Sequence, residues 1–382
     1  MLYEHIPHEM IQFFILYGIT GVVPLIAAVY LLLRRGNAFA PEVTPPIRLR
    51  RWTAAFFAVA ALGHVWWYLF FILCGDLHSA CYVVVVLLDC VTLLTTIAGT
   101  LLAMLQDRKR PIWPAFAAMI PFAVLGVLHI FYPEKPFMNI AAIYILALYV
   151  LFSVYMAFAV RTYGRWLNDN YADLENKRVW LSQVVSFFCL LLFILYALVD
   201  TESVLIYFLH IVELVLFALL LWRVETLPQL GETLPQPLSV NEEKDQAQVQ
   251  EPSTPLTDKE EQGAGSATID FTQIEQLLQE RCIEGGLYLQ HDLSLLQLAQ
   301  SIGTNRYYLS QYFSRKGFTY NAYINDLRIK HFMRLYDEAL AAHQHVVAQH
   351  LASESGYRSY STFSLAFKQR VGETVSTWMN SH

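Results

Sequence analysis

Long apolar blocks restrict the fold of this chain more than any other feature. Seven blocks cover roughly residues 11–33, 52–74, 80–105, 112–132, 137–160, 179–199 and 203–222. Each is close to the ~20 residues that a helix needs to cross ~30 Å of hydrocarbon. They lack the polar face that helices of a soluble bundle carry. The sequence therefore predicts a seven-helix transmembrane domain over residues 1–225.

The charges between the blocks predict the orientation of this domain. With the N-terminus outside, the outer segments carry only Lys135 before residue 223. The inner segments carry Arg34, Arg35, Arg48, Arg50, Arg51, Arg108, Lys109, Arg110, Arg161, Arg165, Lys177 and Arg178. The positive-inside rule then places the C-terminus in the cytoplasm. The flank before the first block is acidic, with Glu4 and Glu9, which argues against a cleavable signal peptide.

Residues 226–268 differ sharply from the apolar blocks. They hold eight acidic residues, two lysines and no aromatic residue. Such a segment buries too little apolar surface to offset its ordering entropy. We expect a flexible, acidic, Pro- and Gln-rich linker with a random-coil span of roughly 35–40 Å. One interpretation is that its negative charge repels it from anionic lipid and DNA. The alternative is that it is a spacer with no such effect.

Residues 269–382 contain the same local pattern twice. In the first copy, Ser294 and Gln297 have capping-box spacing, Gly303 ends the helix, and Asn305 caps the next one. The second copy has its glycine turn at residue 356 and its cap at residue 359, about 53 residues later. A helical stripe over residues 319–340 connects the two copies. A helix, a short turn and a second helix form the helix-turn-helix unit, whose second helix enters the major groove.

The apolar positions of each copy fall at helical spacing and predict its core. In the first copy they are Leu295, Leu298, Ala299, Ile302, Leu309 and Phe313. In the second copy they are Val347, Leu351, Ala352, Phe363 and Phe367. The fold class is therefore all-α: a seven-helix transmembrane bundle, a disordered linker and a C-terminal helical domain with two helix-turn-helix units.

Positive charge gathers on the second helix of each copy. One segment holds Arg306, Arg315 and Lys316, the other holds Arg358, Lys368 and Arg370, and neither contains an acid. Positive charge focused on short helices is typical of phosphate contact.

Residues 287–379 resemble the DNA-binding domain of the AraC/XylS transcription regulators. The resemblance lies in "LSLLQLAQSIGTNRYYLSQYF", "NAYINDLRI" and "LASESGYRSYSTFSLAFKQRVGET". It implies that the two second helices read base edges in adjacent major-groove faces. The positions that it implies for the first helix are Arg306, Tyr307, Ser310, Gln311 and Ser314. Those for the second helix are Tyr360, Ser361, Ser364, Leu365 and Lys368.

The sequence departs from the family pattern at four positions. Tyr357 stands where Phe is usual, Val375 replaces a Pro, and Leu365 and Met379 stand where Arg is common. Gln311 suits bidentate bonding to adenine, and Arg306 suits guanine or phosphate.

Ionisable residues within the apolar blocks are costly and point to function. His64, Asp89, His210 and Glu213 lie in the second, third and seventh blocks. His210 and Glu213 share a helix face because they are three residues apart. These four residues predict a site for a ligand, proton or metal ion, or else hydrogen bonds that fix helix packing. We assign no bound metal or cofactor from the sequence.

Cys74 and Cys81 flank the second outer turn. An oxidising periplasm would allow a disulfide between them, although unpaired cysteines or, with Asp76 and His78, a metal site are alternatives. No H-E-x-x-H pair or phosphate-binding glycine loop occurs, and we expect no enzyme activity.

These features predict a multi-pass regulator of the bacterial inner membrane with its DNA-binding domain in the cytoplasm. Its expected partners are the lipid bilayer, promoter DNA, RNA polymerase and a second copy of itself, as a homodimer or cluster on DNA. The ligand is unknown. The alternative is a membrane enzyme or ligand-binding bundle whose DNA-binding domain anchors it to the chromosome.

Overall fold

The computed structural model describes residues 8–34, 37, 40–41, 43–76, 79–174, 176–198, 203–230, 271–343 and 346–382. Over these residues the chain is helical and contains no strand, which confirms the all-α class. It divides into two compact units. The N-terminal unit comprises residues 1–167 and 174–230, and the C-terminal unit comprises residues 168–173 and 231–382. Residues 231–268 of the expected linker lie outside the described residues.

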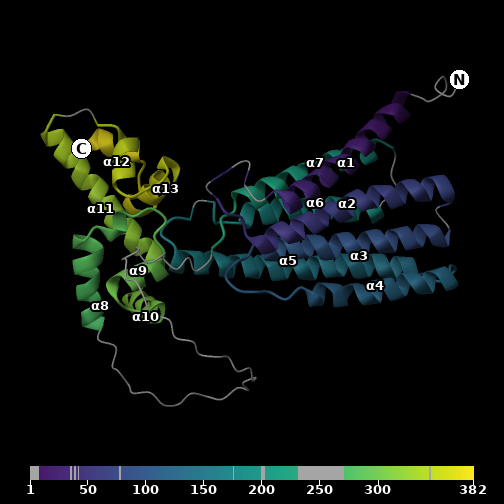
Figure 1. The fold of residues 1–382 in the computed structure, drawn as a ribbon, viewed down its shortest axis with the longest axis horizontal. Helices are drawn as coiled ribbons and strands as arrows, with labels where there is room; N and C mark the ends of the chain where they lie inside the picture. The colour runs from purple at the N-terminus through teal and green to yellow at the C-terminus, as the bar shows by residue number, and fades with distance from the viewer. Residues whose placement is uncertain are drawn as a thin grey trace, which may run out of the picture. The chain divides into compact units, whose positions relative to one another are not determined.

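Seven apolar helices form the N-terminal unit (Figure 1). They are α1 (His8–Leu33), α2 (Ile47–Leu73), α3 (Ala80–Ala103), α4 (Trp113–Phe131), α5 (Phe137–Asn170), α6 (Trp180–Leu198) and α7 (Ser203–Thr226). Six of these are long and apolar enough to cross a membrane. In α6 the apolar stretch among the described residues is shorter and covers Trp180–Leu192. That all seven cross a membrane therefore stays a prediction.

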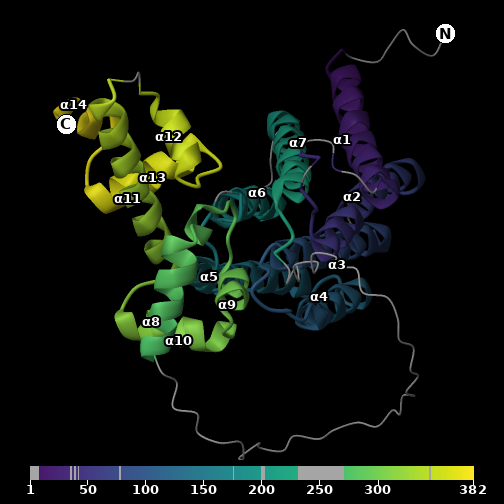
Figure 2. The ribbon, with the colours of Figure 1, turned by 60° about the vertical axis from the view of Figure 1, so that its left-hand side comes forward.

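Neighbours in sequence pack together in the N-terminal unit. Helix α2 lies between α1 and α3, α4 follows α3, and α7 returns to contact α1 and α2 (Figure 2). The Tyr144 hydroxyl of α5 donates to the Ala118 carbonyl of α4 at 2.8 Å. Many large apolar side chains face outward, among them Ile143 at 69% and Leu151 at 66% exposure. An outer surface this apolar is typical of helices that face lipid or another protein.

Among the described residues, the C-terminal unit contains seven α-helices, five of which have a side-chain N-cap. They are α8 (Phe271–Leu277), α9 (Leu295–Ile302), α10 (Arg306–Lys316), α11 (Tyr320–Ala341), α12 (Ala348–Glu354), α13 (Tyr360–Val371) and α14 (Val375–Ser381). A π-helix, Leu278–Glu284, and a 3-10 helix, Leu287–Leu289, lie between α8 and α9. The Ser294–Gln297 capping box is confirmed, as are the caps that Asn305 and Ser359 provide to α10 and α13.

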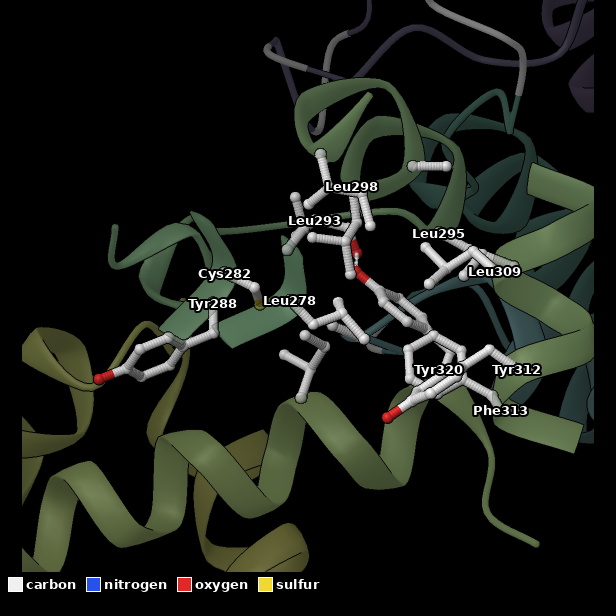
Figure 3. Packing of buried hydrophobic residues seen from close by; sticks show 14 of the residues in the cluster. Leu278, Cys282, Tyr288, Leu293, Leu295, Leu298, Leu309, Tyr312, Phe313 and Tyr320 are labelled. Carbon is white, nitrogen blue, oxygen red and sulfur yellow. Dashed lines mark hydrogen bonds between the residues drawn. The ribbon is translucent and has the colours of Figure 1, made fainter. Parts of the chain in front are cut away.

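Two hydrophobic cores, one for each helix-turn-helix unit, share the long helix α11. The first core gathers α9, α10 and the start of α11, including Leu298, Phe313 and Tyr320 (Figure 3). The second core gathers the end of α11 with α12 to α14, including Phe332 and Phe367. The 22 residues of α11 make a rod of about 33 Å.

All but one of the core residues that the two patterns predict are buried. The exception is Val347, whose side chain is 51% exposed, so its inward placement was wrong. Val347 is the N-cap of α12 and thus precedes the buried stripe of that helix.

Arg328 lies on α11 where the two cores meet. Its side chain is fully buried, and its Nε and Nη2 atoms donate to the carbonyls of Tyr288 and Gln290 at 2.7 and 2.8 Å. Its guanidinium also lies 5.3 Å from the ring centroid of Tyr357, in the second unit. The charge is balanced by Asp173, whose Oδ1 lies 2.8 Å from Nη1.

Asp173 lies between α5 and α6 in sequence, yet it belongs to the C-terminal unit. Its Oδ2 accepts a 2.8 Å hydrogen bond from the Asp292 backbone amide. Ala172, the preceding residue, is 1% exposed within the first core, and its amide donates to the Leu293 carbonyl at 3.2 Å. Residues 168–173 are thus an integral part of the helix-turn-helix domain.

We predict that Asp173→Ala lowers the free energy of unfolding of the C-terminal unit by about 3–5 kcal/mol, because it leaves the Arg328 guanidinium buried and uncompensated. Pulse proteolysis of the full-length protein in detergent, over a urea series, measures this change. Asp337→Ala is the matched control, since Asp337 is exposed on α11 and its loss should cost less than ~0.5 kcal/mol. Equal stability of the two variants would contradict the assignment of residues 168–173 to this unit.

Candidate DNA-binding surface and histidine cluster

Helix α10 presents its predicted reading residues on the side opposite the first core. Arg306, Tyr307, Ser310 and Ser314 are exposed and Gln311 is half-buried. Gln311 Nε2 donates a 2.7 Å hydrogen bond to the Tyr307 hydroxyl. This bond orients the Gln311 amide and leaves its carbonyl oxygen and one N–H group for a base edge.

Helix α13 has the same arrangement. Arg358, Tyr360, Ser361 and Lys368 are exposed and Ser364 is half-buried. Leu365, at 51% exposure, also lies on the outer face. An apolar side chain at this position suits contact with a thymine methyl group better than with phosphate.

Two of the departures from the family pattern, Tyr357 and Val375, are buried, and the Tyr357 hydroxyl has no hydrogen-bond partner among the described residues. Val375 is the first residue of α14, a position where Pro is favoured, and its side chain is buried. Tyr357 is 1% exposed and packs against Phe363 with ring centroids 5.3 Å apart.

Several of the basic side chains pair with acids that the sequence pattern did not place beside them. Lys316 pairs with Glu275 at 3.1 Å, Arg358 with Asp292 at 3.3 Å, and Arg370 with Asp326 at 2.6 Å. The hydrogen bond to Glu275 raises the pKa of the Lys316 ammonium group. Water screens such exposed pairs and they stabilise the fold little, so phosphate can replace the carboxylates.

Arg315 and Arg306 have other neighbours. The Arg315 guanidinium lies over the Phe271 ring, 4.5 Å from its centroid. Arg306 Nε donates a 2.9 Å hydrogen bond to Oδ1 of Asn170, the last residue of α5, in the segment Asn168–Asp173 that belongs to the C-terminal unit. Sequence reasoning missed this segment, since nothing in its local pattern signals a partner more than a hundred residues away.

These observations define a DNA-binding module with two helix-turn-helix units on one connecting helix. A family model described as "Helix-turn-helix domain" matches residues 298–381. The chain thus carries an AraC-type helix-turn-helix domain there, as the resemblance implied. The comparisons with curated proteins and with solved structures gave no match.

In the N-terminal unit, four polar side chains from α1, α2 and α7 form what we call the histidine cluster: Thr20, His64, His210 and Glu213. Glu213 Oε2 lies 3.4 Å from His210 Nδ1 and 4.0 Å from His64 Nε2. The Thr20 hydroxyl lies 2.9 Å from His64 Nε2 and 3.4 Å from His210 Nδ1. Thr20 had no sequence signal, because threonines in apolar helices commonly bond their own backbone.

The histidine cluster has the composition of a site for a proton or a divalent metal ion. One nitrogen of each histidine and one Glu213 oxygen lie within 4.8 Å of one another. His64 Nδ1 lies 2.9 Å from the Ala60 carbonyl, which favours the proton on Nδ1 and leaves Nε2 as an acceptor or ligand. Zinc takes such nitrogen and oxygen ligands at ~2.0–2.2 Å, so binding would require small inward movements of the side chains.

Asp89 does not join the histidine cluster. Its Oδ2 accepts a 3.3 Å hydrogen bond from the Trp67 indole, and its Oδ1 has no hydrogen-bond partner among the described residues. Asp89 nonetheless lies close to Gly63, the neighbour of His64, where an added Cβ would approach Oδ1 to 2.9 Å. Cys74 and Cys81 are exposed free thiols, and their pairing stays a prediction.

We predict that Gln311→Ala relaxes the preference for one base by about 1–3 kcal/mol, because it removes the amide that pairs bidentately with adenine. Binding selection with the full-length protein, followed by sequencing of the bound DNA, measures this preference. Gln300→Ala is the control, since Gln300 is exposed on α9, away from the reading face. An unchanged site preference in Gln311→Ala would show that Gln311 does not read a base.

Proposed function

We propose that this protein is a one-component transcription regulator held in the bacterial inner membrane, which binds promoter DNA through its two helix-turn-helix units. The observation that carries the proposal is the presence of an AraC-type helix-turn-helix domain in the same chain as six helices of membrane-spanning length. The chain would act as a homodimer or cluster and recruit RNA polymerase or exclude it. No catalytic role is proposed.

The position of residues 168–173 supports the proposed topology. These residues belong to the C-terminal unit, so they must lie on the same side of the membrane as that unit. The charge count separately places them inside, because Arg161, Arg165, Lys177 and Arg178 flank them. Two independent arguments, packing and charge, therefore favour a cytoplasmic DNA-binding domain.

Chromatin immunoprecipitation with sequencing, combined with protease digestion of oriented membranes, tests this function. We expect a few sharp peaks at promoters, and cleavage of the C-terminal unit only from the cytoplasmic face. Diffuse chromosomal binding would favour the alternative, in which the DNA-binding domain only attaches the protein to the chromosome. Cleavage of the C-terminal unit from the periplasmic face would refute the proposed topology. Arg306→Ala is a suitable companion variant, since loss of a phosphate or guanine contact should weaken the peaks.

We further propose that the histidine cluster is where the membrane bundle perceives its signal. The cluster joins the first, second and seventh helices, so a proton or metal ion bound there changes how three helices attract one another. Thr20, His64, His210 and Glu213 would supply the ligands or the proton network.

Glu213→Gln should abolish the response of a target-promoter reporter to external pH or added Zn²⁺, because it removes the one carboxylate of the cluster. Reporter output over a pH series and a Zn²⁺ series measures this response. Thr92→Val is the control, since Thr92 bonds the carbonyl of Leu88 on its own helix at 2.6 Å. A reporter response of Glu213→Gln equal to that of the unaltered protein would leave the cluster with a packing role only.

A further inference from the structure

The segment Asn168–Asp173 has two distinct attachments within the C-terminal unit. At one end, Ala172 and Asp173 form an anchor: Ala172 is buried in the first core, and Asp173 is paired with Arg328. Asn321 strengthens the anchor, since its Nδ2 donates to the carbonyls of Ala172 and, at 3.2 Å, of Tyr171. The anchor therefore rests on ion pairing, hydrogen bonds and burial together.

At the other end, Asn170 and Tyr171 form a cap over the start of α10. Asn170, only 8% exposed, accepts the hydrogen bond from Arg306, the first residue of that helix. Tyr171 pairs with Ser294 in an isolated antiparallel bridge. Burial raises the pKa of the Tyr171 hydroxyl, while the positive charge of Arg306 acts in the opposite direction.

The cap lies at the N-terminal end of α10, the end that would contact DNA. In helix-turn-helix proteins, the N-terminal residues of the second helix contact the base edges. Arg306 at this end is exposed except where Asn170 and Tyr171 approach it, and it is the strongest guanine or phosphate candidate of α10. The Arg306 Nε–H group that donates to Asn170 cannot at the same time donate to a guanine or phosphate oxygen.

We propose that Asn170 and Tyr171 compete with DNA for Arg306, so that the segment Asn168–Asp173 restrains DNA binding by its own chain. Release requires movement of the cap only, because the anchor at Asp173 holds the segment in place. Asn170 is the last residue of α5, so the cap is continuous in sequence with that helix. This regulatory role rests on the proposed function, whereas the competition itself does not depend on the signal.

Opposite substitutions at Asn170 test the competition. Asn170→Ala removes the acceptor and should tighten DNA binding on the order of three- to tenfold, the value of one hydrogen bond. Asn170→Asp places a carboxylate against Arg306 and should weaken DNA binding by a similar factor. Fluorescence anisotropy with full-length protein in detergent, on a duplex selected by the unaltered protein, gives the dissociation constants.

The same two substitutions in an Arg306→Ala background are the matched control. With the guanidinium removed, Asn170→Ala and Asn170→Asp should bind DNA equally. Three results would overturn the competition. The dissociation constant for DNA would change in the same direction for both substitutions, would change for neither, or would still differ between them without Arg306. If the unaltered protein binds no duplex, the proposed function itself is refuted, and the competition is refuted with it.

Discussion

The buried ion pair between Arg328 and Asp173 is the interaction on which the DNA-binding half depends. Arg328 holds the two helix-turn-helix units together through the carbonyls of Tyr288 and Gln290 and the ring of Tyr357. A guanidinium without solvent exposure needs a counter-ion, because the desolvation of an isolated charge costs several kcal/mol. In the described part of the chain, Asp173 is the one acid paired with it.

The chain passes between the two units at more than one place in the sequence. The C-terminal unit begins at residue 231 but also includes residues 168–173. These six residues are preceded and followed in sequence by residues of the N-terminal unit. The segment 168–173 is continuous with α5 and accepts hydrogen bonds from Arg306 and Arg328.

Much of this architecture could be predicted from local sequence. Ser294, Asn305 and Ser359 cap the helices that their spacing predicts, since a cap depends only on residues three positions apart. The buried faces of α9, α10 and α13 follow from helical periodicity. Thr20 and Asn170 could not be predicted, because hydroxyl and amide groups find partners through packing that leaves no local pattern. The acids beside Lys316, Arg358 and Arg370 were hidden for the same reason.

The sequence by itself determined the all-helical class, the apolar blocks and the two helix-turn-helix units, because hydrophobic periodicity and helix caps act over a few residues. Only the tertiary structure decided that Asp173, 155 residues before Arg328, supplies its counter-ion, and that Thr20, His64 and Glu213 meet. The reason is physical: the partner of a buried charge or polar group is set by which helices pack together, and that depends on the whole chain.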